Sequence, residues 1–72
     1  MKLTKTEYEI LALLRSHRGQ VVDACTIYER VWGQRFLPSA QNTVSVHVLH
    51  LRRKLKGSER IRTVWGRGYT LD

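Results

Sequence analysis

The segment from Ser39 to Lys56 constrains the fold of this 72-residue chain more than any other. Its buried-type aliphatic residues recur at helical spacing: Val44, Val48, Leu51 and Leu55. Spacings of four, three and four place them in one stripe along a helix of about residues 40–56. The opposite face mixes short polar groups, aliphatic side chains and cations: Asn42, Ser45, Val46, Leu49, His50 and Arg53. The segment has no Asp or Glu, so this face fits a DNA major groove better than plain solvent.

The charge of the chain is strongly positive and unevenly distributed. Thirteen Lys and Arg residues against six Asp and Glu residues give a formal net charge of +7. No acidic residue lies between Glu29 and Glu59, and the second half gathers the cations Arg52, Arg53, Lys54, Lys56, Arg60, Arg62 and Arg67. This balance on a small domain indicates nucleic acid or an anionic membrane as partner. The alternative is a basic surface that only keeps the domain soluble.

Several other classes of protein are disfavoured. A single cysteine, Cys25, excludes an internal disulfide and a cysteine-based zinc site, and we expect its thiol to be packed beside the core. His47 and His50 lie three residues apart, but two imidazoles alone make a poor metal site. No cofactor motif or nucleophile–base set indicates an enzyme. The chain shows no signal peptide and no membrane-spanning run, so we expect a cytoplasmic location.

Two shorter helices are predicted before this segment, in a single domain of residues 1–72. Thr4 and Glu7 form a capping-box pattern, and Asp23 is a typical N-cap. Gly19 and Gly33 are predicted to end the two helices. In the first helix we expect these residues to be substantially buried: Tyr8, Ile10, Leu11, Leu13 and Leu14. In the second, the inner stripe is Ile27, Tyr28, Val31 and Trp32.

The rest of the chain supplies a loop and a hairpin. Residues 34–39 form the loop, and we expect Phe36, Leu37 or both to fold onto the core. Ser39 or Asn42 is expected to cap the third helix. Residues 60–71 read as two strands around a glycine-bracketed turn, where Trp65 either packs on the domain or contacts DNA. The predicted fold is therefore mainly α with a small β-hairpin: a winged helix-turn-helix whose wing is the hairpin.

Motifs in a fixed order cover nearly the whole chain. They are Leu3–Leu11, Gly19–Val22, Val31–Gly33, Asn42–Val48, Leu51–Leu55 and Ile61–Tyr69. Together they resemble the C-terminal effector domain of OmpR/PhoB-type bacterial response regulators. Asn42-Thr43-Val44, followed in the wing by Thr63-Val64-Trp65-Gly66, looks most like the VanR-type branch.

The resemblance implies sequence-specific binding of double-stranded DNA for transcription regulation. The helix of residues 40–56 would enter the major groove, and the wing of residues 61–71 would approach the minor groove. The base-facing positions are Thr43, Ser45, Val46, Leu49 and His50. The positions that hold phosphates are Trp32, Asn42, His47, Arg52, Thr63 and Tyr69, to which the basic cluster adds Arg53. At the wing tip, Trp65 and Arg67 would reach the minor groove.

The resemblance also implies partners and shows departures. It implies a receiver domain in a two-component phosphorelay, tandem promoter half-sites, and a domain that is monomeric alone and dimeric on DNA. Neither the receiver nor the small N-terminal strand layer of relatives has a counterpart in this sequence. Leu49, His50 and Trp65 stand where many relatives carry arginine, so an arginine–guanine contact is not assured. The alternative function is a protein-interaction module that docks RNA polymerase through the 34–39 loop, with secondary DNA affinity.

Overall fold

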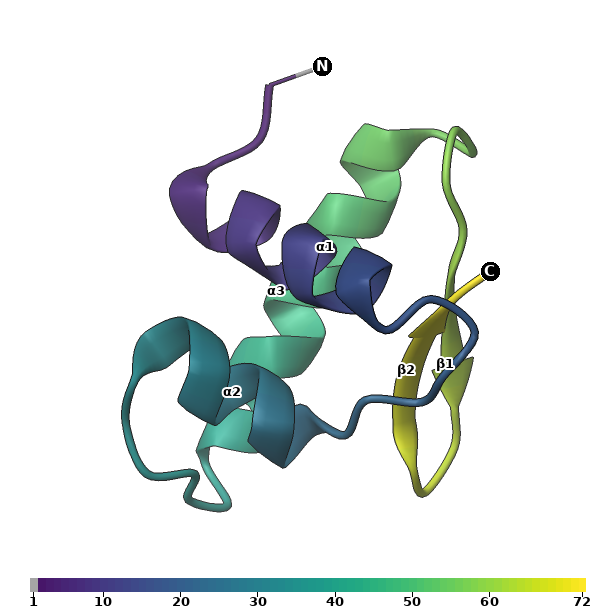
Figure 1. Ribbon diagram of the computed structural model, residues 1–72. Coiled ribbons are helices and arrows are strands. Elements are labelled where there is room, and N and C mark those ends of the chain that lie inside the picture. Colours follow the sequence, from purple (N-terminus) through teal and green to yellow (C-terminus); the bar gives the residue numbers. More distant parts are fainter. Residues whose placement is uncertain (1) are drawn as a thin grey trace.

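The computed structural model describes residues 2–72 as three helices followed by a two-stranded hairpin (Figure 1). The helices are α1 (Lys5–Ser16), α2 (Ala24–Trp32) and α3 (Ala40–Leu55), and the strands are β1 (Ile61–Val64) and β2 (Gly68–Leu71). Both α1 and α2 pack on α3, and α1 also contacts β2. The predicted order of helices and wing is confirmed. None of the helices in residues 2–72 is long and apolar enough to cross a membrane.

The inner stripe of α3 forms the centre of the core. Val44, Val48 and Leu51 are fully buried, and Leu55 is 2% exposed, so the predicted stripe is confirmed. Side chains from every other element cover it: Ile10, Leu11, Leu14, Val22, Ile27, Ile61 and Leu71. Burying one such side chain contributes about 1.5–3 kcal/mol, so α3 is held mainly by this stripe and its outer face is left free.

The ends of α1 and α2 follow the predicted local chemistry. The Thr4 N–H donates to Glu7 Oε1 at 2.9 Å, and the Glu7 N–H donates to Thr4 Oγ1 at 3.2 Å, which confirms the capping box. Asp23 Oδ1 accepts from the Thr26 N–H at 2.7 Å at the start of α2. Gly33 ends α2 with a left-handed φ of 69°. α1 ends at Ser16, and His17 occupies its C-cap position. Gly19, which was predicted to end the helix, lies in the turn that follows, with a φ of 84°.

The predicted cap of α3 is wrong. Ser39 occupies the N-cap position, but its backbone is helical (φ −65°, ψ −23°) and its side chain makes no capping bond. Asn42 already lies inside the first turn of the helix. A turn leads directly into α3 instead: the Ala40 N–H donates to Leu37 O at 2.8 Å, and the Gln41 N–H donates to Pro38 O at 3.2 Å. Main-chain carbonyls therefore replace the side-chain cap.

Two residues that were expected to be buried are exposed. Tyr8 is 58% exposed on α1, and Cys25 is exposed in the first turn of α2. Both lie outside the buried residues of their helices, which are Glu7, Ile10, Leu11 and Leu14 in α1 and Ala24 and Ile27 in α2. In the 34–39 loop Phe36 packs against Tyr28, with ring centroids 5.9 Å apart, while Leu37 stays 53% exposed. The expectation that at least one of the two loop residues joins the core is confirmed.

The wing is joined to the link between α1 and α2. β1 and β2 pair antiparallel, with Thr63 opposite Tyr69 and Val64 opposite Gly68. Val22 forms a further antiparallel bridge to Tyr69, through N–H···O bonds of 2.8 and 2.9 Å. Figure 1 shows this link running across β2. Val22 therefore joins the α1–α2 link to the edge of the two-stranded sheet, and this bridge fixes the wing beside α1 and α2.

Candidate nucleic-acid interface

The outer face of α3 presents most of the predicted base-facing residues. Val46 and Leu49 are 37% and 44% exposed, His50 is exposed, and Thr43 is half-buried. No acidic residue lies on α3. Its last turn carries Arg52, Arg53 and Lys54, so the face is apolar and polar at its centre and cationic at its C-terminal end.

Ser45 and Tyr69 meet between α3 and the wing. Ser45 Oγ donates to the Gln41 carbonyl at 3.0 Å and lies 3.2 Å from the Tyr69 hydroxyl. A hydroxyl has one proton, so Ser45 accepts from Tyr69 in this arrangement. Tyr69 is only 7% exposed. The structure thus brings a predicted base-facing residue and a predicted phosphate ligand together, and it uses both in the contact between helix and hairpin.

Arg52 forms a second link from α3 to the wing. Its Nε donates to the main-chain oxygen of Ile61 at 2.8 Å, and its Nη2 donates to Thr63 Oγ1. The guanidinium carbon lies 5.8 Å from the ring centre of Tyr69, a cation–π distance. An arginine has five N–H donors, so three remain for a phosphate after these two bonds. Arg52, Thr63 and Tyr69, all predicted phosphate ligands, therefore lie in one cluster.

Trp32 and His47 form a neighbouring cluster where α2 packs on α3. The Trp32 ring stacks on Tyr28 at 5.1 Å and 15°, and meets the His47 ring edge-on at 5.1 Å and 83°. His47 Nδ1 lies 2.8 Å from the Thr43 carbonyl. A carbonyl can only accept, so Nδ1 carries a proton and Nε2 is left for another partner. Both rings are partly buried, and the contacts with Tyr28, with each other and with the Thr43 carbonyl fix their orientation.

The wing tip projects from the domain. Trp65 is 90% exposed, so it does not pack on the protein, and Arg67 beside it is also exposed. The Arg67 N–H donates to Val64 O at 2.9 Å and closes the turn, in which Gly66 has a φ of 77°. The turn therefore holds an indole and a guanidinium at the outermost point of the hairpin.

A groove of about 480 Å³ joins the contact of Ser45 with Tyr69 to the wing tip, whereas Trp32, His47 and Arg52 lie outside its lining. It runs between the first turn of α2, the first turns of α3 and the wing, and its lining includes Ser45, Thr63, Trp65, Arg67 and Tyr69. The groove brings predicted DNA ligands from helix and hairpin onto one concave surface.

Cys25 also lines this groove, although no function was predicted for it. Desolvation raises the pKa of its thiol, and the nearby carboxylates of Glu29 and Asp23 raise it further. The thiol is therefore protonated at neutral pH and is a poor nucleophile. Among residues 2–72, no group of three or more His, Cys, Asp and Glu residues could hold a metal ion.

Several cationic side chains form ion pairs with acidic residues of the same chain, which the sequence did not indicate. Lys54 of α3 pairs with Glu7 of α1 at 2.7 Å. Burial would raise the pKa of Glu7, but the bonds from Lys54 and from Thr4 outweigh it and lower the pKa. Lys54 therefore anchors α1 on α3 and does not contribute a free charge to the outer face of α3.

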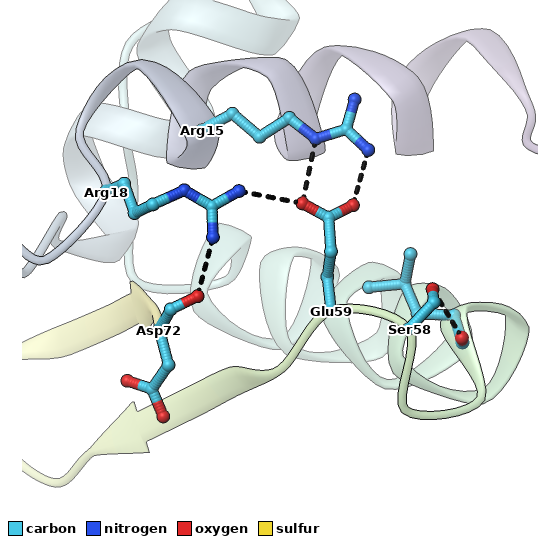
Figure 2. Close-up of polar contacts among 6 residues, drawn as sticks. Arg15, Arg18, Ser58, Glu59 and Asp72 are labelled. Carbon is cyan, nitrogen blue, oxygen red and sulfur yellow. Dashed lines mark hydrogen bonds and ion pairs between the residues drawn. The ribbon is translucent and has the colours of Figure 1, made fainter.

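A larger ionic cluster lies at the C-terminal end of α1. Figure 2 shows Arg15 and Arg18 both pointing at the carboxylate of Glu59, while Arg18 also donates to the main-chain oxygen of Asp72 at 2.7 Å. The hydrogen bond from Arg15 lowers the pKa of Glu59 against the effect of burial, and Arg18 lowers it further. Within residues 2–72, no ion pair is formed by Arg52, Arg53, Lys56 or Arg67, so these are the cations that α3, its C-cap and the wing tip offer to a ligand.

Comparisons with known proteins agree with this geometry. The family described as "Transcriptional regulatory protein, C terminal" matches residues 1–71. The chain is 36% identical over 76 residues to Regulatory protein VanR of Enterococcus faecium, which covers 100% of this chain and 33% of VanR. The chain thus spans about a third of the length of the curated relatives it matches.

Solved structures show the same arrangement. The DNA-binding domain of Bacillus subtilis CssR superposes with a TM-score of 0.87 at 30% identity, covering 99% of this chain and 78% of that one. The RstA DNA-binding domain of Klebsiella pneumoniae, solved in complex with the RstA box, has a TM-score of 0.85 at 28% identity and covers 97% and 72%. The chain belongs to the OmpR/PhoB-type family of winged-helix DNA-binding domains, the C-terminal domains of transcriptional regulatory proteins.

Proposed function

We propose that this domain binds promoter DNA sequence-specifically, with α3 in the major groove and the wing toward the minor groove. One observation carries the proposal: Ser45 of α3 and the predicted ligands of the hairpin line a single groove beside a helix face that has no acidic residue. A duplex presents phosphates between its two grooves, so a helix and a wing on either side of a concave surface match its shape.

The residues divide into roles by position. Thr43, Val46, Leu49 and His50 face the bases, and Ser45 does so only with the lone pair that its bonds to Gln41 and Tyr69 leave free. The phosphate ligands are Trp32, Asn42, Arg52, Arg53 and Thr63. Tyr69 joins them when its hydroxyl proton turns from Ser45 to the phosphate, and His47 joins them when its Nε2 also carries a proton. Arg67 enters the minor groove with Trp65 beside it, since a narrow minor groove attracts arginine.

Regulation follows the pattern of the relatives. Among them is Response regulator SaeR of Staphylococcus epidermidis, 39% identical over 70 residues. We propose that a receiver domain controls the present domain through a phosphorelay, and that two copies bind tandem half-sites. Leu37, exposed in the 34–39 loop, offers RNA polymerase a contact in addition to DNA binding, not in place of it.

Selection from a random duplex pool tests DNA binding directly. The chain is used to enrich bound duplexes, and affinity for the enriched site is then compared with random duplex at rising salt. We expect an enriched motif, preference over random duplex, and a log–log salt slope of about −0.9 for each phosphate contacted. A flat salt response, or equal affinity for random duplex, would contradict the proposal.

A further inference from the structure

We propose that Val46 and Leu49 form a reader of thymine methyl groups, so that the domain selects sites with two closely spaced thymines in the major groove. The inference rests on the proposed function and specifies the kind of DNA sequence that it selects. It depends on the exposure of these two side chains, on the absence of arginine and lysine from residues 40–51, and on the surrounding charge.

The two side chains are exposed and take no part in the hydrophobic core. They are the exposed large hydrophobic residues of α3, at 37% and 44%, while the core contacts of the helix are made by its opposite stripe. Residues three apart on a helix are neighbours, with Cβ atoms about 5–6 Å apart. Val46 and Leu49 therefore form one continuous apolar surface on the outer face.

The cationic groups that usually read guanine are absent from this part of α3. Guanine is read in the major groove mainly by arginine or lysine, and residues 40–51 contain neither. Arg52 is turned to Ile61 and Thr63 of the wing, and the Ser45 hydroxyl is engaged by Gln41 and Tyr69. The thymine C5-methyl is the group in the major groove that an aliphatic side chain contacts favourably.

The charge around the pair favours DNA over a protein partner. α3 carries no acidic residue, and Arg53 lies two turns beyond Val46 on the same face. Lys56 and Arg67 add positive charge at the end of the helix and at the wing tip. The two apolar side chains would contact the methyl-bearing edges of the bases, and the cations around them would contact the phosphates on either side. Since base pairs stack about 3.4 Å apart, the two methyls would lie one or two steps apart.

Replacing thymine by deoxyuridine tests this inference. Deoxyuridine keeps every hydrogen-bonding group of thymine and lacks only the methyl. In the duplex selected by the wild-type chain, each thymine is replaced singly and the dissociation constant is measured. We expect about four-fold weaker binding at each of two positions under α3, the loss typical of one methyl-sized contact, and no change at other thymines.

Alanine variants assign the two positions. Leu49→Ala should remove the penalty for uracil at one position and Val46→Ala at the other, because the side chain that senses the methyl is gone. Tyr8→Ala, an exposed hydrophobic residue on α1, is the matched control and should keep both penalties. Circular dichroism melting checks that each variant is folded, and we expect it to be, since all three side chains are exposed.

Three results would overturn the inference. The first is a selected site without thymine under α3, and the second is equal affinity for thymine and uracil duplexes with the sequence preference intact. The third is a Leu49→Ala variant that binds every duplex as the wild type does, which would point to a protein-docking surface. The first two leave the proposed function standing. A wild-type domain without any sequence preference is a separate, fourth result, and it would overturn both the inference and the proposed function.

Discussion

At the scale of single residues, Glu7 connects two helices. Its carboxylate accepts from the Thr4 N–H at the start of α1 and from Lys54 Nζ of α3, and only 3% of the residue is exposed. A buried carboxylate without these donors would be unfavourable, so both contacts are needed for its burial. The same residue therefore starts one helix and attaches it to the helix that we propose faces DNA.

Replacing Glu7 by glutamine should lower the free energy of unfolding by about 1–2 kcal/mol at neutral pH, through the lost ion pair and a weaker capping box. The folded pKa of Glu7 is lowered, so its contribution is present above the ordinary carboxyl pKa of 4.5 and is lost as the pH falls through the folded value. Urea titrations between pH 7 and pH 3 should show the two proteins converging in acid.

Glu9→Gln is the matched control for this prediction. Glu9 lies on the same helix and forms no ion pair within residues 2–72. We expect its replacement to change the unfolding free energy by less than about 0.5 kcal/mol at every pH. A Glu7→Gln variant as stable as Glu9→Gln at neutral pH would show that the Lys54 pair contributes nothing.

At the scale of elements, the close approach of β2 to the α1–α2 link fixes the position of the wing relative to the helices. At Gly68 an added Cβ would lie 2.3 Å from the Val22 carbonyl oxygen, and the residue has a φ of 147°. A glycine is therefore required both by its backbone conformation and by the neighbouring chain. The bridge from Val22 to Tyr69 depends on this contact.

Gly68→Ala should destabilise the domain by about 2–3 kcal/mol, because the link and β2 must separate to make room for the methyl group. Gly66→Ala is the comparison: its φ is also positive, at 77°, but nothing lies within 4 Å of an added Cβ. Its cost should be about 1 kcal/mol, from backbone strain alone. Chemical denaturation of both variants measures the difference, and equal losses would mean that the close approach is unimportant.

Local signals explain which elements the sequence predicts well. The capping box, the Asp23 cap and the stripe of α3 each involve residues three or four apart, and all three are confirmed. The bridge of Val22 to Tyr69 and the bonds from Arg52 to the wing join residues that are distant in sequence or lie beyond a turn, and no short motif encodes them. The wrong cap at Ser39 has the same origin, since main-chain geometry of the preceding turn overrode a residue preference.

At the scale of the whole molecule, the cations fall into two groups. Some pair with acidic residues and stabilise the fold, and the others are left unpaired and can bind a ligand. The acids that form ion pairs, Glu7, Glu59 and Asp72, lie outside α3 and the strands. Their partners include residues 41 to 47 positions away, so the sequence shows the net charge but not which cations are already neutralised. The family of the domain was predictable from ordered motifs, whereas the free cations at the candidate site were visible only in the fold.

Removing one charge from each group should separate these roles. Arg53→Ala should reduce the steepness of the log–log salt dependence of DNA binding by about 0.9, the value for one phosphate contact. Arg15→Ala changes the net charge equally but removes a partner of Glu59, so it should leave the salt slope unchanged and lower the urea midpoint. Fluorescence anisotropy at several salt concentrations measures the slopes. Equal slopes for Arg53→Ala and the wild type would exclude Arg53 as a phosphate ligand.

The bridge between Val22 and Tyr69, together with the bonds of Arg52, leaves the wing no independent hinge relative to α3. A domain that holds a duplex through both elements then presents its two contacts at one fixed angle around the DNA axis. On the DNA, the angle between the two sites that α3 and the wing contact is set by the local helical twist. Overwinding or underwinding of the promoter would therefore change the fit of the site, and binding would depend on DNA supercoiling as well as on base sequence.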